Sequence, residues 1–206
     1  NGVIHAIDSV LIPPGFDVEE FLESCTKGDD DDDDDDNENL LDIPITAFSF
    51  TSLRTFVSEL DKADLIDDLS EPNGPFTVFA PTENAFNELP DELVDCLNRP
   101  ENKPELSYIL TYHAAFGRIM SSDLMDEMTI RTLDGGYLTV DRNGRVVNIN
   151  DARVVNADIR ASNGVIHVID SVLVPPGFDV SDFLDACTGS DDDDDDDNDG
   201  DDDDDD

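Results

Sequence analysis

Basic residues are scarce in this sequence of 206 residues. It has 11 Lys and Arg against 53 Asp and Glu, which gives a formal net charge of −42. A protein that binds nucleic acid needs a positively charged surface for the phosphates, so this charge excludes nucleic acid as a direct partner. It also argues against binding to an anionic membrane surface. No apolar run reaches the roughly 18 residues that cross a bilayer, so we expect no membrane span in this sequence.

The sequence motifs of common enzymes are missing as well. There is no Gly-x-Ser-x-Gly, no phosphate-binding loop, no His-Glu-x-x-His and no dinucleotide fingerprint. No Cys-x-x-Cys or Cys/His spacing suggests zinc, and no EF-hand pattern is present. Arg-Gly-Asp and the Asn-x-Ser/Thr glycosylation signal are also absent. We therefore expect a protein that is not an enzyme and has no dedicated cofactor.

Two aspartate tracts hold 22 of the 53 acidic residues, eight in 29–36 and fourteen in 191–206. They have no apolar side chains to offset the entropy of ordering, and their charges repel, so we expect both tracts to be disordered. Carboxylates suit Ca²⁺, which predicts weak, non-specific metal binding. The alternative is a solvated spacer between domains. The metal-binding candidates are Asp29, Asp30, Asp31, Asp32, Asp33, Asp34, Asp35, Asp36, Asp191, Asp192, Asp193, Asp194, Asp195, Asp196 and Asp197.

A repeat links the two ends of the sequence. Residues 1–26 and 163–188 are identical at 20 of 26 positions, and each copy is followed by an aspartate tract. This predicts a repeating unit of one folded domain plus one acidic spacer. The expected organisation is a C-terminal remnant of a preceding domain (1–28), an acidic linker (29–43), a complete domain (44–188) and a disordered tail (189–206).

The three cysteines fit this repeat. Cys25 and Cys187 occupy the same position in successive copies, and Cys96 lies inside the complete domain. The simplest pairing is a disulfide between Cys96 and Cys187, which would suit an extracellular protein. The alternative is three unpaired thiols.

Apolar spacing predicts helices in the first half of the domain and strands in the second. Leu53, Phe56, Val57 and Leu60 form one apolar stripe of a helix over 49–61, which Ser49 or Thr51 can cap. Further helices are expected over 63–69, 83–88, 91–98, 104–112 and 180–186.

Strands are expected over 76–80, 128–133, 137–141, 145–149, 152–156 and 164–173. Asp134-Gly135 and Asn143-Gly144 are typical hairpin turns, which favour an antiparallel meander. Helices followed by such a meander indicate the α+β class.

Three motifs in this order resemble a known family. Phe76–Phe86 is similar to the first signature block of the fasciclin (FAS1) domain, Asn163–Pro175 to the second, and Tyr112-His113 to the Tyr-His motif between them. The resemblance implies a β-wedge of short antiparallel strands packed with several helices. It also implies a secreted or cell-surface adhesion protein, often with tandem domains.

The resemblance also suggests partner-binding residues. Tyr112 and His113 are linked both to structure and to adhesion in the family, and the alternative is a pair of core residues with satisfied hydrogen bonds. Asp158 and Ile159 resemble an Asp-Ile motif through which family members contact integrins, and the alternative is a turn aspartate before a strand. His167, between apolar neighbours, is expected in the core.

These observations predict a secreted or cell-surface adhesion or matrix-organising module. Its expected partners are extracellular proteins or glycans, including an adhesion receptor. The rival hypothesis is an acidic matrix or mineral-associated protein, in which the aspartate tracts bind and the domain is a scaffold.

Overall fold

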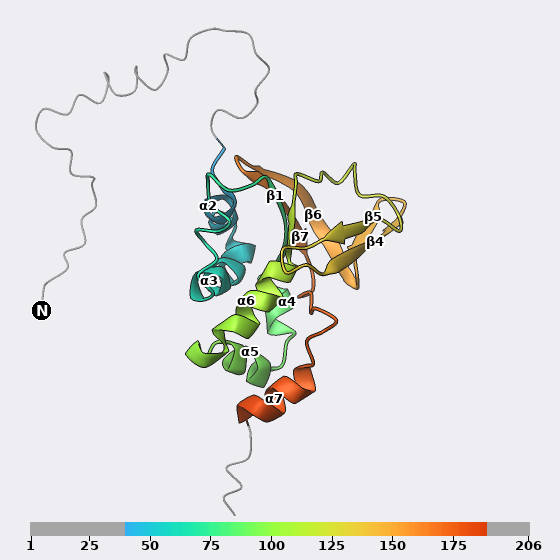
Figure 1. The fold of residues 1–206 in the computed structure, drawn as a ribbon. Helices are drawn as coiled ribbons and strands as arrows, with labels where there is room; N and C mark the ends of the chain where they lie inside the picture. The colour runs from blue at the N-terminus through green and yellow to red at the C-terminus, as the bar shows by residue number, and fades with distance from the viewer. Residues whose placement is uncertain (1–39, 189–206) are drawn as a thin grey trace, which may run out of the picture. The chain divides into compact units, whose positions relative to one another are not determined.

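The computed structural model describes residues 40–188 (Figure 1). The first repeat copy and both aspartate tracts, with their expected disorder and Ca²⁺ binding, lie outside the described residues. The helices are α2 (Ile43–Phe48), η1 (Thr51–Leu53), α3 (Arg54–Lys62), α4 (Glu83–Asn87), α5 (Asp91–Leu97), η2 (Pro100–Asn102), α6 (Lys103–Tyr112) and α7 (Val180–Thr188). The strands are β1 (Phe76–Pro81), β2 (Ala114–Phe116), β3 (Thr129–Arg131), β4 (Tyr137–Asn143), β5 (Val146–Ile149), β6 (Ala152–Ala161) and β7 (Gly164–Ile169).

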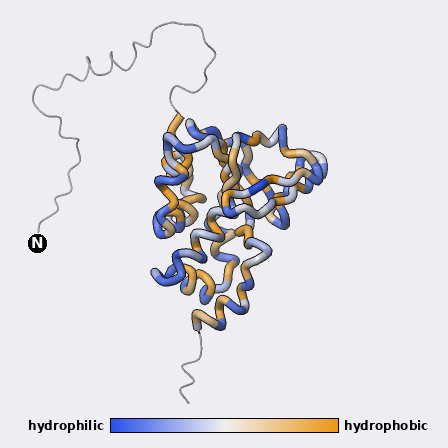
Figure 2. The backbone as a smooth tube through the Cα atoms, viewed as in Figure 1, coloured by the Kyte–Doolittle hydropathy of each residue, from blue (hydrophilic) through white to orange (hydrophobic). Residues whose placement is uncertain are grey.

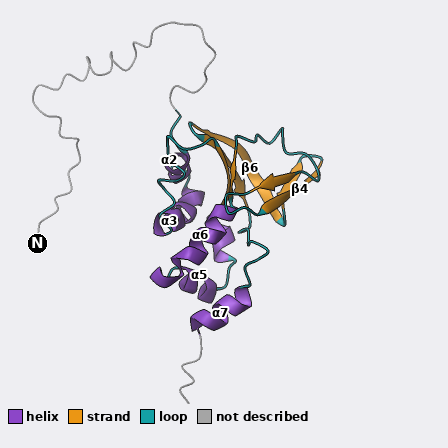
Figure 3. Ribbon diagram, viewed as in Figure 1, coloured by secondary structure: helices purple, strands orange, loops and turns teal. Residues whose placement is uncertain are grey.

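The strands form one sheet in the order β2-β1-β7-β6-β5-β4-β3. Figure 3 shows the strands gathered on one side of the domain, with helices α5, α6 and α7 below them. Strands β3 to β7 are a continuous antiparallel meander, as the hairpin turns predicted. The α+β class is confirmed, but the expectation of antiparallel strands alone is wrong for one pair. β1 runs parallel to β7, because the chain makes a long excursion through α4, α5, α6 and the meander before it returns.

β7 lies at the centre of the fold, between β1 and β6, and all six of its residues are buried. At its start, Gly164 passes so close to β1 that an added Cβ would lie 2.1 Å from the Phe76 carbonyl oxygen. The preceding Asn163 accepts a hydrogen bond from the Ile43 backbone N–H (2.9 Å) and donates one to the Leu69 carbonyl (2.7 Å). This stretch therefore ties the sheet to the helical side of the domain.

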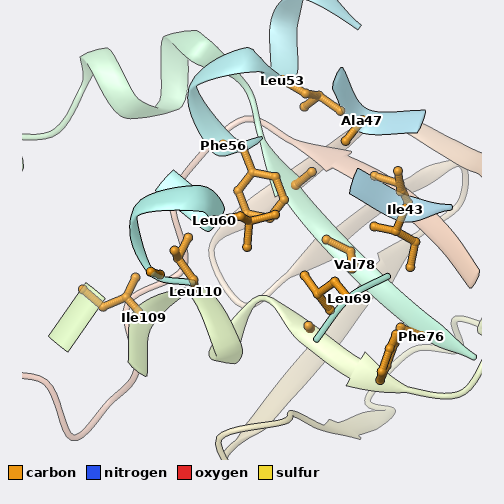
Figure 4. Close-up of a cluster of buried hydrophobic side chains, with 14 of the residues drawn as sticks. Ile43, Ala47, Leu53, Phe56, Leu60, Leu69, Phe76, Val78, Ile109 and Leu110 are labelled. Carbon is orange, nitrogen blue, oxygen red and sulfur yellow. The ribbon is translucent and has the colours of Figure 1, made fainter. Parts of the chain in front are cut away.

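A large hydrophobic cluster fills the space between the helices and the sheet (Figure 4). Phe56 and Leu60, from the apolar stripe of α3, are 1% and 0% exposed and pack with Val78 of β1. Ile43 of α2 and Leu110 of α6 belong to the same cluster. Hydrophobic and hydrophilic residues alternate along these helices, as expected when only one face is buried (Figure 2).

A second cluster lies beneath strands β3 to β6, which we call the β lobe (residues 129–161). Every second residue of β4 is buried through Val140, and Leu138 and Val140 pack with Ile130 and Ile149 of the neighbouring strands. Phe79, from β1, joins them. The period of two in the sequence therefore corresponds to a sheet with one buried face.

Some helix predictions are wrong. Residues 63–69 form turns, with Asp64 at φ 57°, so the apolar residues there pack from irregular backbone. The helix expected from residue 49 begins as 3₁₀ turn η1, and neither Ser49 nor Thr51 caps α3. The short helix α2, which Asp42 caps through the Ile45 N–H, was not predicted. Thr82 does cap α4 as expected.

Strand boundaries also differ from prediction. β2 was missed because three residues are too few to show a period. β6 continues to Ala161, because irregular pairing with β7 between Val154 and Ile159 interrupts its alternation without ending the strand. β7 ends at Ile169, and the residues that follow it form a loop that leads to α7.

A disulfide joins Cys96 of α5 to Cys187 of α7, which are 91 residues apart in sequence. Arg99 also donates a hydrogen bond to the Cys187 carbonyl (2.7 Å). Helix α7 is thus linked covalently to helix α5.

Candidate functional site

The Tyr-His motif lies at the junction of α6 and β2, and both side chains are 1% exposed. Backbone geometry explains the placement, since α6 ends at Tyr112 and His113 is its C-cap. The two rings consequently point into different parts of the domain. His113 contacts Phe56 with a ring-centroid distance of 6.3 Å, whereas Tyr112 belongs to the cluster under the β lobe.

Both nitrogens of His113 are bonded within the domain. Nδ1 lies 2.8 Å from the Ile109 carbonyl oxygen, and Nε2 accepts the Leu173 backbone N–H at 2.9 Å. The ring is therefore neutral and carries its proton on Nδ1. Burial lowers the pKa of His113 to about 4, although the bond to Ile109 opposes this shift. His113 thus links α6 to the loop that follows β7.

Tyr112 links α6 to the β lobe. Its hydroxyl donates to the Tyr137 carbonyl (2.9 Å) and accepts a hydrogen bond from the Asn150 side chain (3.1 Å). Burial raises the pKa of Tyr112, and the bond from Asn150 acts in the opposite direction. Tyr112 and His113 are therefore core residues with satisfied hydrogen bonds. This agrees with the alternative to a partner-binding role that the sequence left open.

The Asp-Ile pair lies at the irregular part of β6, where Asp158 adopts φ 62°. The Asp158 carboxylate accepts hydrogen bonds from both the backbone N–H (2.7 Å) and the hydroxyl of Ser121. Burial would raise the pKa of Asp158, but the hydrogen bonds from Ser121 and the positive charge of Arg160 oppose it, and the pKa is lowered. Ile159 is half-buried and packs against the main hydrophobic cluster.

His167 lies beside this bend of β6 and is hydrogen-bonded to its backbone. It is fully buried and stacks on Phe79 with a centroid distance of 5.6 Å. Nδ1 accepts the Asp158 N–H (3.3 Å), and Nε2 lies 2.8 Å from the Ile119 carbonyl oxygen. Burial lowers the pKa of His167, so the ring is neutral and carries its proton on Nε2. As expected, it is a core residue.

The structure does not bring the four partner-binding candidates together as one surface. Tyr112 and His113 are buried, whereas Asp158 and Ile159 are half-buried on the β lobe. Cys96 is in a disulfide, and no group of three or more His, Cys, Asp or Glu residues within 40–188 is placed to hold a metal ion. The motif residues act chemically as hydrogen-bond links between segments.

Ser121 and Arg142 complete this region, and neither was predicted from the sequence. Arg142 of β4 donates from Nη1 to the carbonyls of Ser121 (3.0 Å) and Leu124 (2.8 Å), and so fixes the loop that holds Asp158. Neither residue lies in a motif, and their contacts span about 20 to 40 positions along the chain. Nothing in the local sequence could have identified them.

A family model described as the fasciclin domain matches residues 51–175. Protein sll1483 of Synechocystis sp. is 47% identical over 122 residues, covering 59% of this chain and 67% of its own length. Human periostin is 32% identical over 176 residues, covering 85% of this chain but only 18% of its own length.

A solved structure shares the fold. The FAS1 domain pair of the insect cell adhesion molecule Fasciclin I superposes with a TM-score of 0.59, covering 65% of this chain and 51% of that one. The sequence identity is 19%, so this likeness concerns the fold alone.

Proposed function

Since the chain belongs to the fasciclin domain family, we propose that it is a non-catalytic extracellular adhesion or matrix-organising module. The family match over 51–175 carries the proposal, and one protein of the same fold is a cell adhesion molecule. The Cys96–Cys187 disulfide supports an oxidising, extracellular location. Among residues 40–188, no helix is both long and apolar enough to cross a membrane.

We place the protein or glycan contact at the bend of β6 that contains Asp158 and Ile159. This bend is half-buried, whereas Tyr112 and His113 are buried and have the supporting role of holding α6, β2 and the β lobe in register. The contact would use side chains around the bend, because the Asp158 carboxylate is already bonded to Ser121.

Retention of cells under flow on a surface coated with the 206-residue chain tests this proposal. We expect Ile159→Ala to lower retention several-fold while the urea midpoint shows that the domain is folded. Val174→Ala, at a partly exposed apolar position away from β6, is the matched control. No retention by the unmodified chain would contradict the adhesion function, and equal loss in both variants would contradict the placement.

The second candidate is an acidic matrix or mineral-associated protein, which the concentration of 22 of 53 acidic residues in two tracts favours. Calorimetric Ca²⁺ titration at about 0.15 M salt distinguishes it. The unmodified chain is compared with a variant whose tract aspartates are replaced by serine. Several weak sites lost in the variant, together with loss of retention, would favour the matrix function; retention without Ca²⁺ heats would favour adhesion by the domain.

A further inference from the structure

Charge is divided unevenly within the described domain. The β lobe contains five arginines and four carboxylates, which gives a net charge of +1. The remainder of residues 40–188 contains five basic residues and 21 carboxylates, which gives −16. β4, β5 and β6 lie together in the ribbon, away from α5 and α7 (Figure 1). One part of a very acidic molecule is therefore free of net negative charge.

The cations of the β lobe are all arginines: Arg131, Arg142, Arg145, Arg153 and Arg160. Within the described residues, the ion pairs involve Lys62 with Glu59 and Lys103 with Asp64, all of them on the helical side. The lobe arginines thus form no ion pair with a described carboxylate. A guanidinium can bind a carboxylate through two parallel hydrogen bonds, which an ammonium cannot.

Two of these arginines line one hollow of about 250 Å³ between the β4–β5 hairpin and β6. Arg142 and Arg145 are the charged residues in its wall, and the other lining residues are Ser121, Leu124, Val147, Val154, Val155 and Ala157. The wall therefore combines positive charge with apolar surface and contains no carboxylate.

The groups around the hollow favour the binding of an anion. The Arg142 guanidinium is held by the Ser121 and Leu124 carbonyls, so little side-chain entropy remains to be lost on binding. Arg145 follows Gly144 (φ 63°) at the hairpin turn and is exposed. The nearby Asp158 carboxylate faces Ser121, and Asp126 accepts the Arg142 backbone N–H (2.9 Å), so both acids are already hydrogen-bonded.

We propose that this hollow binds an acidic peptide, and that its occupant is an aspartate tract of a second copy of this chain. An extended tract places alternate residues about 7 Å apart, so neighbouring carboxylates on one side can engage both arginines. The net charge of −16 elsewhere on the domain repels such a tract and directs it to the β lobe. The tracts would then link molecules without Ca²⁺.

Salt should affect this contact in two directions. Long-range repulsion between acidic molecules opposes it at low salt, whereas at about 0.15 M the screening length of about 8 Å leaves mainly the local attraction. At about 1 M the arginine contacts are screened as well. We therefore expect the affinity to pass through a maximum near physiological salt.

The probe is an octa-aspartate peptide titrated into the ¹⁵N-labelled 206-residue chain at about 0.15 M salt. We expect amide shifts confined to 142–146, 154–157 and the loop at Ser121. Arg145→Gln should weaken binding about ten-fold, and Arg145→Lys, which keeps the charge but loses the fork, about three-fold. Arg131→Gln is the matched control, because it removes the same charge from an exposed position of β3 and should change affinity less than two-fold.

Three results would overturn the proposal. The first is the absence of shifts at every salt concentration. The second is equal weakening by Arg145→Gln and Arg131→Gln, which would indicate a lobe-wide charge effect. The third is binding of a sulfated oligosaccharide without binding of octa-aspartate, which would make a glycan the occupant. Sedimentation of the unmodified chain and of Arg145→Gln tests the second-copy occupant: only the former should self-associate.

Discussion

The β lobe contains five arginines and four carboxylates, whereas the rest of the described domain contains 21 carboxylates and five basic residues. The two regions also differ in how they are held. The helical side has the larger hydrophobic cluster and the disulfide. In the β lobe, hydrogen bonds from Arg142, Ser121 and Tyr112 fix the backbone around a smaller cluster. The helical elements therefore form a covalently braced body, whereas the β lobe depends more on polar contacts.

Reduction of the Cys96–Cys187 disulfide should have the largest effect on stability, and it should affect the helices more than the β lobe. Releasing a link across 91 residues costs about 4.6 kcal/mol of unfolding free energy in the chain-entropy account. Urea unfolding of Cys187→Ser measures the cost, with Cys25→Ser as the matched control. Amide exchange should accelerate in α7 and remain slow in β4; equal acceleration in both would remove the distinction between the regions.

Acid should next weaken the junction between the regions. His113 has a pKa of about 4 when folded and about 6.5 when unfolded, so the unfolded state binds more protons between these values. The stability due to neutral His113 is complete above pH 6.5 and is lost as the pH falls towards 4, by about 3 kcal/mol. Urea unfolding from pH 7 to 4 measures this slope. An unchanged slope in His113→Asn would contradict the assignment.

The repeat offers a matched test of the larger hydrophobic cluster, to which Val168 of β7 belongs. The two copies differ at six positions, and in the described copy only Val168 among them is buried. Val168→Ala, which introduces the residue of the first copy, should cost about 2 kcal/mol, because two buried methyl groups are lost. Changing exposed Ser181, Asp182, Asp185 and Ala186 to their counterparts should change the urea-derived free energy by less than about 0.5 kcal/mol each.

The smallest effect concerns the β lobe. Ser121→Ala removes the hydroxyl bond to Asp158, which should cost about 1 kcal/mol and raise the pKa of Asp158 towards its ordinary value. Carboxyl NMR titration and urea unfolding measure the two changes. Ser122→Ala, which is exposed beside it, should alter neither. A normal Asp158 pKa in the unmodified chain would contradict the described geometry.

Most of the regular elements could be predicted from the sequence, because their signals are local. The stripe of α3, the Thr82 cap and the hairpins around Gly135 and Gly144 each depend on residues within a few positions. Predictions failed where packing overrode local preference, as at 63–69, or where an element was too short to show a period, as in β2. The array organisation of the full protein stays a prediction.

The site could be predicted only in part, for the same reason. The motif identified Tyr112, His113 and Asp158, but their bonding partners Asn150, Leu173 and Ser121 are 37 to 60 residues away. The division of charge is visible in the sequence, yet the hollow that brings Arg142 and Arg145 against β6 is not.

By itself, the sequence determined four properties of this protein: its charge, its repeat, its α+β class and its family. These depend on residue counts, periodicity and short motifs. The tertiary structure alone decided that β1 runs parallel to β7, that the Tyr-His pair is internal and that Ser121 holds Asp158. These properties depend on which distant segments pack together, and the free energy of that packing is summed over the whole core.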